Sequence, residues 1–116
     1  MTPKAAALLA AERTKRFIGQ SFGKLGTVSN NPNIAVNWDI TSTHALQRMA
    51  ERGVTQRMVD QWVRHGVSLL QSGGQYLYLT PQGVAVVNQV GKLMTTYPAS
   101  HFDQTMRDLV TLIFGS

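Results

Sequence analysis

Apolar and polar residues recur along this chain with spacings that predict a succession of short helices and strands. Thr2-Pro3 is a favourable N-cap and first helical position, and the alanine-rich segment behind it predicts a helix ending near Arg16. Residues 29–33, which read Ser-Asn-Asn-Pro-Asn, predict a loop or linker. Apolar residues then alternate over residues 34–40, as they would in a short strand.

Two amphipathic helices are predicted next. The first covers residues 43–53, with Ser42 or Thr43 as its cap, and it ends at a glycine. The second runs from a cap at Thr55 to about His65, and its apolar residues fall at i, i+1, i+4 and i+5, which forms one stripe to bury. These apolar residues are Met58, Val59, Trp62 and Val63.

Short strand-like runs and a last helix complete the pattern. The predicted strands cover residues 67–71, 75–80, 84–90 and 92–97. Glycine-containing turns at 73–74 and 81–83 predict hairpins between them, and residues 102–114 form an amphipathic helix. The predicted fold is therefore α+β, with N-terminal helices packed on a small antiparallel β-meander sheet and a C-terminal helix.

Composition limits the class of protein. The 116 residues, 43% of them hydrophobic, suit one small globular domain. We expect residues 1–33 to form a helical appendage and linker, and residues 34–116 to form the compact part. No run of about 18 apolar residues exists, which predicts no membrane span. The absence of cysteine excludes disulfides, zinc–thiolate sites and a thiol nucleophile.

The charge of the chain indicates an anionic partner. The formal net charge is +5 and the pI is about 10.1. Residues 1–30 carry +4 of this charge, whereas residues 40–116 carry only +2. A solvated helix face is the alternative interpretation of the N-terminal basic residues.

The predicted helix over residues 43–53 places three chemically useful side chains on one stripe. His44, Arg48 and Arg52 recur at i, i+4 and i+8. Cleavage of RNA without a metal needs a group that removes the 2′-hydroxyl proton and cations that stabilise the phosphorane, and histidine and arginine supply these. The stripe therefore favours a ribonuclease. The structural alternative is a helix-start histidine and arginines that pair with surface acids.

Hydroxyl groups on the last predicted strand are the natural complement to this stripe. Tyr97 offers a hydrogen-bond donor and a ring that stacks on an exposed base, and Thr95 or Thr96 offers a second donor. Strand alternation puts Thr95 on the face of Tyr97, while Thr96 is the threonine nearer the end of the strand, so both stay candidates. Isolated histidines at 44, 65 and 101 and scattered acids show no ligand spacing, so we expect no metal site and no cofactor.

The segment from Thr43 to Thr55, followed by meander strands and Met94-Thr95-Thr96-Tyr97, resembles the barnase/EndoU/colicin/RelE superfamily of small ribonucleases. Over residues 40–116 the chain looks most like the toxin domains at the C-termini of contact-dependent growth inhibition proteins. The resemblance implies a ribonuclease fold of that superfamily and metal-independent cleavage of RNA, commonly tRNA.

The resemblance also implies roles for individual residues. It places His44 and Arg48 on a helix, and Thr95 or Thr96 and Tyr97 on a late strand, from which members of the superfamily supply catalytic groups. The candidate catalytic residues are therefore His44, Arg48, Thr95, Thr96 and Tyr97.

Members of the superfamily often use a lysine or a second histidine as well. This chain offers only Lys92 and His101, which join Arg52 as candidate substrate-binding residues. The partners that the resemblance implies are RNA, a dedicated immunity protein that we expect to be acidic and, as a further option, a host translation factor. Its implied setting is the C-terminal part of a secreted or cell-surface effector that acts in the cytoplasm of a target cell.

Two other functions fit the same residues. A RelE-like mRNA interferase of a toxin–antitoxin pair would cleave ribosome-bound message, although such proteins are usually more densely basic than this chain is over residues 40–116. In a non-catalytic RNA-binding or protein-interaction module, His44 and Arg48 would only contact phosphate. Substitution of His44 separates a nuclease from a binding module.

Overall fold

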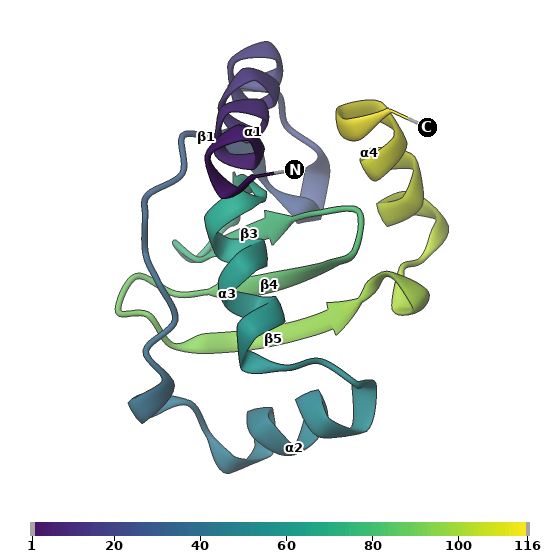
Figure 1. The fold of residues 1–116 in the computed structure, drawn as a ribbon. Coiled ribbons are helices and arrows are strands. Elements are labelled where there is room, and N and C mark those ends of the chain that lie inside the picture. Colours follow the sequence, from purple (N-terminus) through teal and green to yellow (C-terminus); the bar gives the residue numbers. More distant parts are fainter. Residues whose placement is uncertain (1, 116) are drawn as a thin grey trace.

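Within residues 2–115, which the computed structural model describes, the strands form one five-stranded antiparallel sheet. Each strand pairs with its neighbours in the chain, so the order across the sheet is β1-β2-β3-β4-β5 (Figure 1). The strands are β1 (Thr27–Ser29), β2 (Val67–Leu70), β3 (Tyr76–Leu79), β4 (Gly83–Val87) and β5 (Leu93–Pro98). The meander predicted from the sequence is therefore confirmed, with strand ends that differ by at most three residues.

Four α-helices accompany the sheet in the described residues. They are α1 (Pro3–Phe17), α2 (Thr43–Arg52), α3 (Gln56–His65) and α4 (Gln104–Phe114). Short 3₁₀ turns lie at Gly23–Leu25, Trp38–Ile40 and Ala99–His101. Each α-helix begins at a polar cap whose side chain accepts a backbone N–H of the first turn, which satisfies a donor that would otherwise lack a partner. The caps are Thr2, Ser42, Thr55 and Asp103.

The two faces of the sheet are buried by different helices. On one face, α4 packs on the strands through Met106, Leu109 and Ile113. On the other face, α2 and α3 bury Met49 and Trp62 among their apolar residues, and α3 lies across the sheet (Figure 1). The predicted α+β class, with helices first and a C-terminal helix on the sheet, is therefore confirmed.

The strand predicted over residues 34–40 is wrong. The segment is extended without pairing in the sheet and ends in the 3₁₀ turn Trp38–Ile40. Its alternation arises because Val36 is buried, with Ile34 and Trp38 partly buried, in the cluster that α2 and α3 form on the sheet face. A segment that lies over a sheet face alternates like a strand but has no neighbouring strand to pair with.

The N-terminal segment contributes a strand, β1, that the sequence pattern did not predict. Val28 of β1 pairs with Leu69 of β2 and is only 1% exposed, inside the core that α4 covers. The predicted division at residue 33 stays a prediction, but residues on both sides of it share one sheet. In the described residues, no helix is long and apolar enough to cross a membrane.

Candidate active site

A cleft lies between α2 and β5, which is an edge strand of the sheet. Its volume is about 270 Å³. It brings together five of the residues predicted from the sequence, namely His44, Arg48, Arg52, Thr95 and Thr96. The rest of its lining comes from Ser42, Ala45, Leu93 and Met94.

The cap and the buried side of α2 orient its functional side chains. Ser42 Oγ accepts the N–H of Ala45 at 3.0 Å, which starts the helix, and Met49 is buried at 3% exposure against the sheet. This anchoring leaves His44 and Arg48 exposed, one turn apart. Arg48 Nε donates to His44 Nε2 at 3.4 Å, so the first two residues of the predicted stripe are in contact.

Arg52 ties the end of α2 to the edge strand. Its Nη1 donates to the carbonyl of Thr96 at 2.9 Å, and the side chain is half-buried. One of its N–H groups is therefore used to position α2 beside β5, while the charge of the guanidinium stays at the cleft. Arg52 acts as a link between the two walls of the cleft as well as a cation in its lining.

The two threonines of β5 have different surroundings. Thr96 pairs with Ala85, is 4% exposed, and its hydroxyl donates to the carbonyl of Val84 at 2.7 Å. Thr95 pairs with Val86 and is exposed. Because a bulge between Val86 and Val87 leaves Met94 without a partner, two consecutive residues of the strand are exposed. Thr95 is therefore the threonine whose hydroxyl is accessible at the cleft.

Tyr97 lies outside the lining of the cleft. Its ring packs edge-on against Phe102, with ring centroids 5.9 Å apart. Burial raises the pKa of the Tyr97 phenol above its usual value of 10, and the charge of Asp103 raises it further, while Arg52 opposes them. The phenol is therefore protonated at neutral pH. Two other predicted residues, the exposed Lys92 and His101, do not line the cleft either.

Of the four lining residues that were not among the candidates from the sequence, Ser42 and Met94 are exposed. Ser42 was expected only as a helix cap, although its position two residues before His44 was a usable signal. Met94 precedes the candidate threonines, and its place in the lining depends on the bulge, for which the sequence offered no signal. Ser42 and Met94 both line the cleft because α2 and β5 lie side by side.

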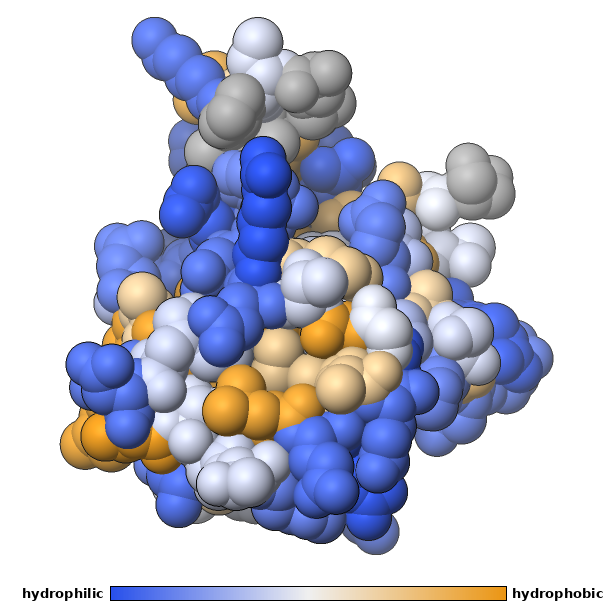
Figure 2. Space-filling model, turned by 60° about the horizontal axis from the view of Figure 1, so that its bottom comes forward, coloured by the Kyte–Doolittle hydropathy of each residue, from blue (hydrophilic) through white to orange (hydrophobic). Residues whose placement is uncertain are grey.

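Apolar surface accompanies the charged groups at this end of the molecule. Ile40, Leu46 and Met94 are 44%, 38% and 47% exposed. Figure 2 brings the α2 end of Figure 1 forward and shows apolar residues gathered in the middle of the face, with more hydrophilic residues around them. The cleft therefore offers apolar contact through Met94 beside two guanidinium groups.

The cleft is cationic, because its described lining includes Arg48 and Arg52 but no acidic residue. Among residues 2–115, no three His, Cys, Asp or Glu side chains come together in a group that could hold a metal ion. Comparison of the chain with protein-family models, with curated proteins and with solved structures found no match.

Proposed function

We propose that this protein is an endoribonuclease that cleaves RNA at the cleft between α2 and β5 without a metal ion. The observation that carries the proposal is that one cleft holds His44, Arg48, Arg52 and the exposed Thr95. A proton-accepting imidazole, two cations and a hydroxyl donor are the groups that attack by a 2′-hydroxyl on a phosphodiester requires.

In the proposed reaction, the imidazole of His44 takes the proton of the 2′-hydroxyl as its oxygen attacks phosphorus. Arg48 and Arg52 neutralise the charge that develops on the phosphorane, and Thr95 donates a hydrogen bond to it. The bond from phosphorus to the 5′-oxygen then breaks, which leaves a 2′,3′-cyclic phosphate and a 5′-hydroxyl. Water supplies the proton for the leaving oxygen, because the described lining holds no second proton-transfer side chain. Tyr97, Lys92 and His101 take no part in this chemical step.

Resemblance to the barnase/EndoU/colicin/RelE superfamily supports a biological setting for this reaction. We propose that the protein is the antibacterial toxin domain of a contact-dependent growth inhibition system, with the ribonuclease fold of that superfamily and tRNA as its substrate. In this proposal it is delivered by a secreted or cell-surface effector and acts in the cytoplasm of the target cell. An acidic immunity protein suits the net charge of +5, and a host translation factor is a further candidate partner.

One observation favours a second function, a non-catalytic RNA-binding module. His44 is the one histidine in the described lining of the cleft, and its Nε2 already accepts a hydrogen bond from Arg48. A cleft of this kind holds a phosphate without cleaving it if nothing accepts the 2′-hydroxyl proton. The two functions differ in what substitution of His44 does.

The test is cleavage of total bacterial RNA by the purified protein in EDTA, resolved on a denaturing gel. We expect a discrete product of tRNA size, and we expect His44→Ala to lower its rate by about two to four orders of magnitude while RNA affinity is kept. His101→Ala is the matched control, since His101 is also an exposed histidine but does not line the cleft.

Two outcomes would count against the proposal. RNA that stays intact, even when cell extract is added to supply a host factor, would favour the binding module. Equal loss of cleavage in His44→Ala and His101→Ala would show that the cleft does not carry the reaction. Retained RNA binding in both variants confirms that they fold.

A further inference from the structure

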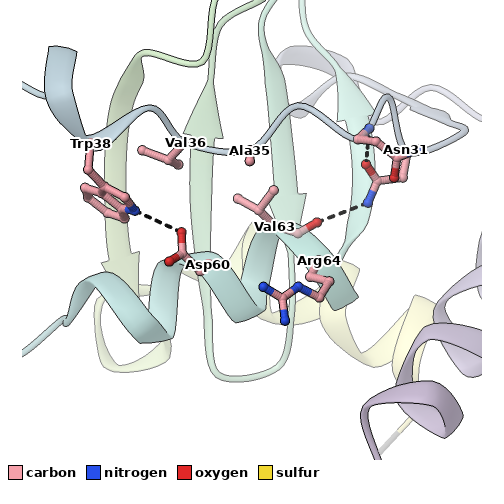
Figure 3. A pocket seen from close by; sticks show the side chains of 8 residues that line it. Asn31, Ala35, Val36, Trp38, Asp60, Val63 and Arg64 are labelled. Carbon is pink, nitrogen blue, oxygen red and sulfur yellow. Dashed lines mark hydrogen bonds between the residues drawn. The ribbon is translucent and has the colours of Figure 1, made fainter.

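A second groove, larger than the cleft, runs between the extended segment 31–38 and α3 (Figure 3). Its volume is about 410 Å³, within the range of small-molecule sites. Ala35, Val36 and Val63 make its apolar floor. Trp38 and Asp60 lie at one end, and Arg64 lies toward the other (Figure 3).

Hydrogen bonds at both ends hold the walls of this groove together. Trp38 Nε1 donates to Asp60 Oδ1 at 3.0 Å, and Asn31 Nδ2 donates to the carbonyl of Val63 at 3.0 Å. Asn31 also accepts the N–H of Asn33 at 2.7 Å, which steadies the left-handed conformation of Asn33 at φ 59°. The groove is therefore formed before any ligand arrives, which lowers the entropy cost of binding.

The Arg64 end of the groove continues into a neighbouring hollow of about 340 Å³. The two share Asn31, Asn33 and Arg64, and the hollow adds Lys15 from α1. Lys15 Nζ lies 3.8 Å from Glu12 Oε1 in an exposed ion pair. Arg64 is also exposed, but it forms no ion pair among the described residues. One end of the groove is thus aromatic with a carboxylate, and the other end carries a guanidinium able to bind an anion.

We propose that this groove binds one unpaired guanine nucleotide. The base lies on the apolar floor beside Trp38, and the phosphate meets Arg64. Asp60 Oδ1 accepts one hydrogen bond from Trp38 and keeps a second lone pair, and Oδ2 accepts none among the described residues, so both carboxylate oxygens can accept from a base edge. Guanine presents two adjacent N–H donors on its Watson–Crick edge, which suit a carboxylate, whereas adenine presents an acceptor beside its amino group. A carboxylate at the base end therefore selects guanine.

In the sequence, groove residues come shortly before cleft residues. The inference that a nucleotide in the groove influences cleavage rests on the proposed function. Trp38 lines the groove and Ser42 and His44 line the cleft, with the 3₁₀ turn Trp38–Ile40 between the two sites. A single strand that crosses this turn places a nucleotide in the groove while its neighbour is cut. The groove thereby gives the nuclease a preference for guanine near the cleavage position.

The test is titration of the intact protein with 5′-GMP and with 5′-AMP, followed by tryptophan fluorescence. Trp62, the second tryptophan, is 5% exposed and does not line the groove, so the change reports on Trp38. We expect saturable binding of 5′-GMP that is at least about fivefold tighter than that of 5′-AMP. Trp38→Phe should remove the fluorescence change, which assigns the signal.

Two variants test the two ends of the groove, and a third serves as their control. Arg64→Gln should weaken 5′-GMP binding about tenfold, and Arg57→Gln, on the same helix but outside the groove, should leave it unchanged. Asp60→Asn keeps an acceptor for Trp38 but loses the charge, so it should erase the difference between 5′-GMP and 5′-AMP. Their melting temperatures, compared with that of the unsubstituted protein, show that the variants fold.

The inference is overturned by any of three results. These are no fluorescence change with 5′-GMP up to about 10 mM, equal affinity for the two nucleotides, and equal weakening by Arg64→Gln and Arg57→Gln. Nucleotide binding needs no cleavage, so its failure leaves the nuclease proposal standing. Conversely, saturable 5′-GMP binding by a protein that leaves RNA intact retains the site and rejects the nuclease.

Discussion

Thr95 and Thr96 are adjacent on β5, yet only one has a hydroxyl that is accessible at the cleft. The hydroxyl of Thr96 is buried and bonded to the carbonyl of Val84, whereas Thr95 is exposed beside the bulge. At the scale of single residues, the structure therefore separates a group that stabilises the sheet from a group available to a phosphate.

Substitution of each threonine by valine tests this separation. Thr96→Val should lower the free energy of unfolding by about 1 kcal/mol, because a buried hydrogen bond is lost. It should leave the rate of RNA cleavage unchanged. Thr95→Val should change stability by less than about 0.5 kcal/mol and slow RNA cleavage about tenfold. Urea denaturation and cleavage rates measure the two effects. The reverse pattern would place the Thr96 hydroxyl in the site.

At the scale of elements, β1 shows how a short segment joins the sheet. It has three residues, and its pairing with β2 is supported by Val28, which is buried under α4. Gly19 N–H donates to the Val28 carbonyl and Val28 N–H to the Gln20 carbonyl, both at 2.9 Å, so the outer edge of β1 is covered by the chain leaving α1. Covered edges do not offer a template for association with other chains.

Truncation of Val28 tests whether the N-terminal segment is part of the fold in solution. Val28→Ala should lower the free energy of unfolding by about 2 kcal/mol, because it removes buried methyl groups and leaves a cavity. Val90→Ala is the matched control, since Val90 is 71% exposed, and its effect should be below about 0.5 kcal/mol. Equal effects of the two substitutions in urea denaturation would contradict the pairing of β1.

At the scale of the whole molecule, the extended segment before α2 is held to the sheet face through Tyr78. Its phenol donates to the carbonyl of Ile34 at 3.4 Å, and the ring is fully buried. Burial is the main cause that raises the pKa of Tyr78 from 10 to about 12. The folded protein therefore keeps a proton that the unfolded chain loses at lower pH.

This difference in pKa predicts that stability falls in alkali. Between about pH 10 and pH 12 the unfolded state loses the Tyr78 proton while the folded state retains it, so the free energy of unfolding decreases as pH rises. The full loss amounts to roughly 2–3 kcal/mol, of which about 1–2 kcal/mol appears by about pH 11. Urea denaturation at about pH 8 and about pH 11 measures it, and Tyr78→Phe should reduce the decrease by that amount. An unchanged decrease in the variant would contradict the assignment.

The sequence by itself, through its local periodicity, determined most of the helices and strands of this protein. Helix geometry places His44, Arg48 and Arg52 on one side whatever lies around them, and caps and glycine turns limit the elements to their observed places. The meander followed for the same reason, because its strands pair with sequence neighbours.

The tertiary structure decided what depends on contacts between distant residues. The pairing of Val28 with Leu69 joins residues far apart in the chain, and the alternation over 34–40 has the same form on a sheet face as in a strand. Likewise, packing against Phe102 keeps Tyr97 out of the cleft, and a bulge selects Thr95 over Thr96. Periodicity specifies which side of an element a residue occupies, but burial among other elements decides what that side meets.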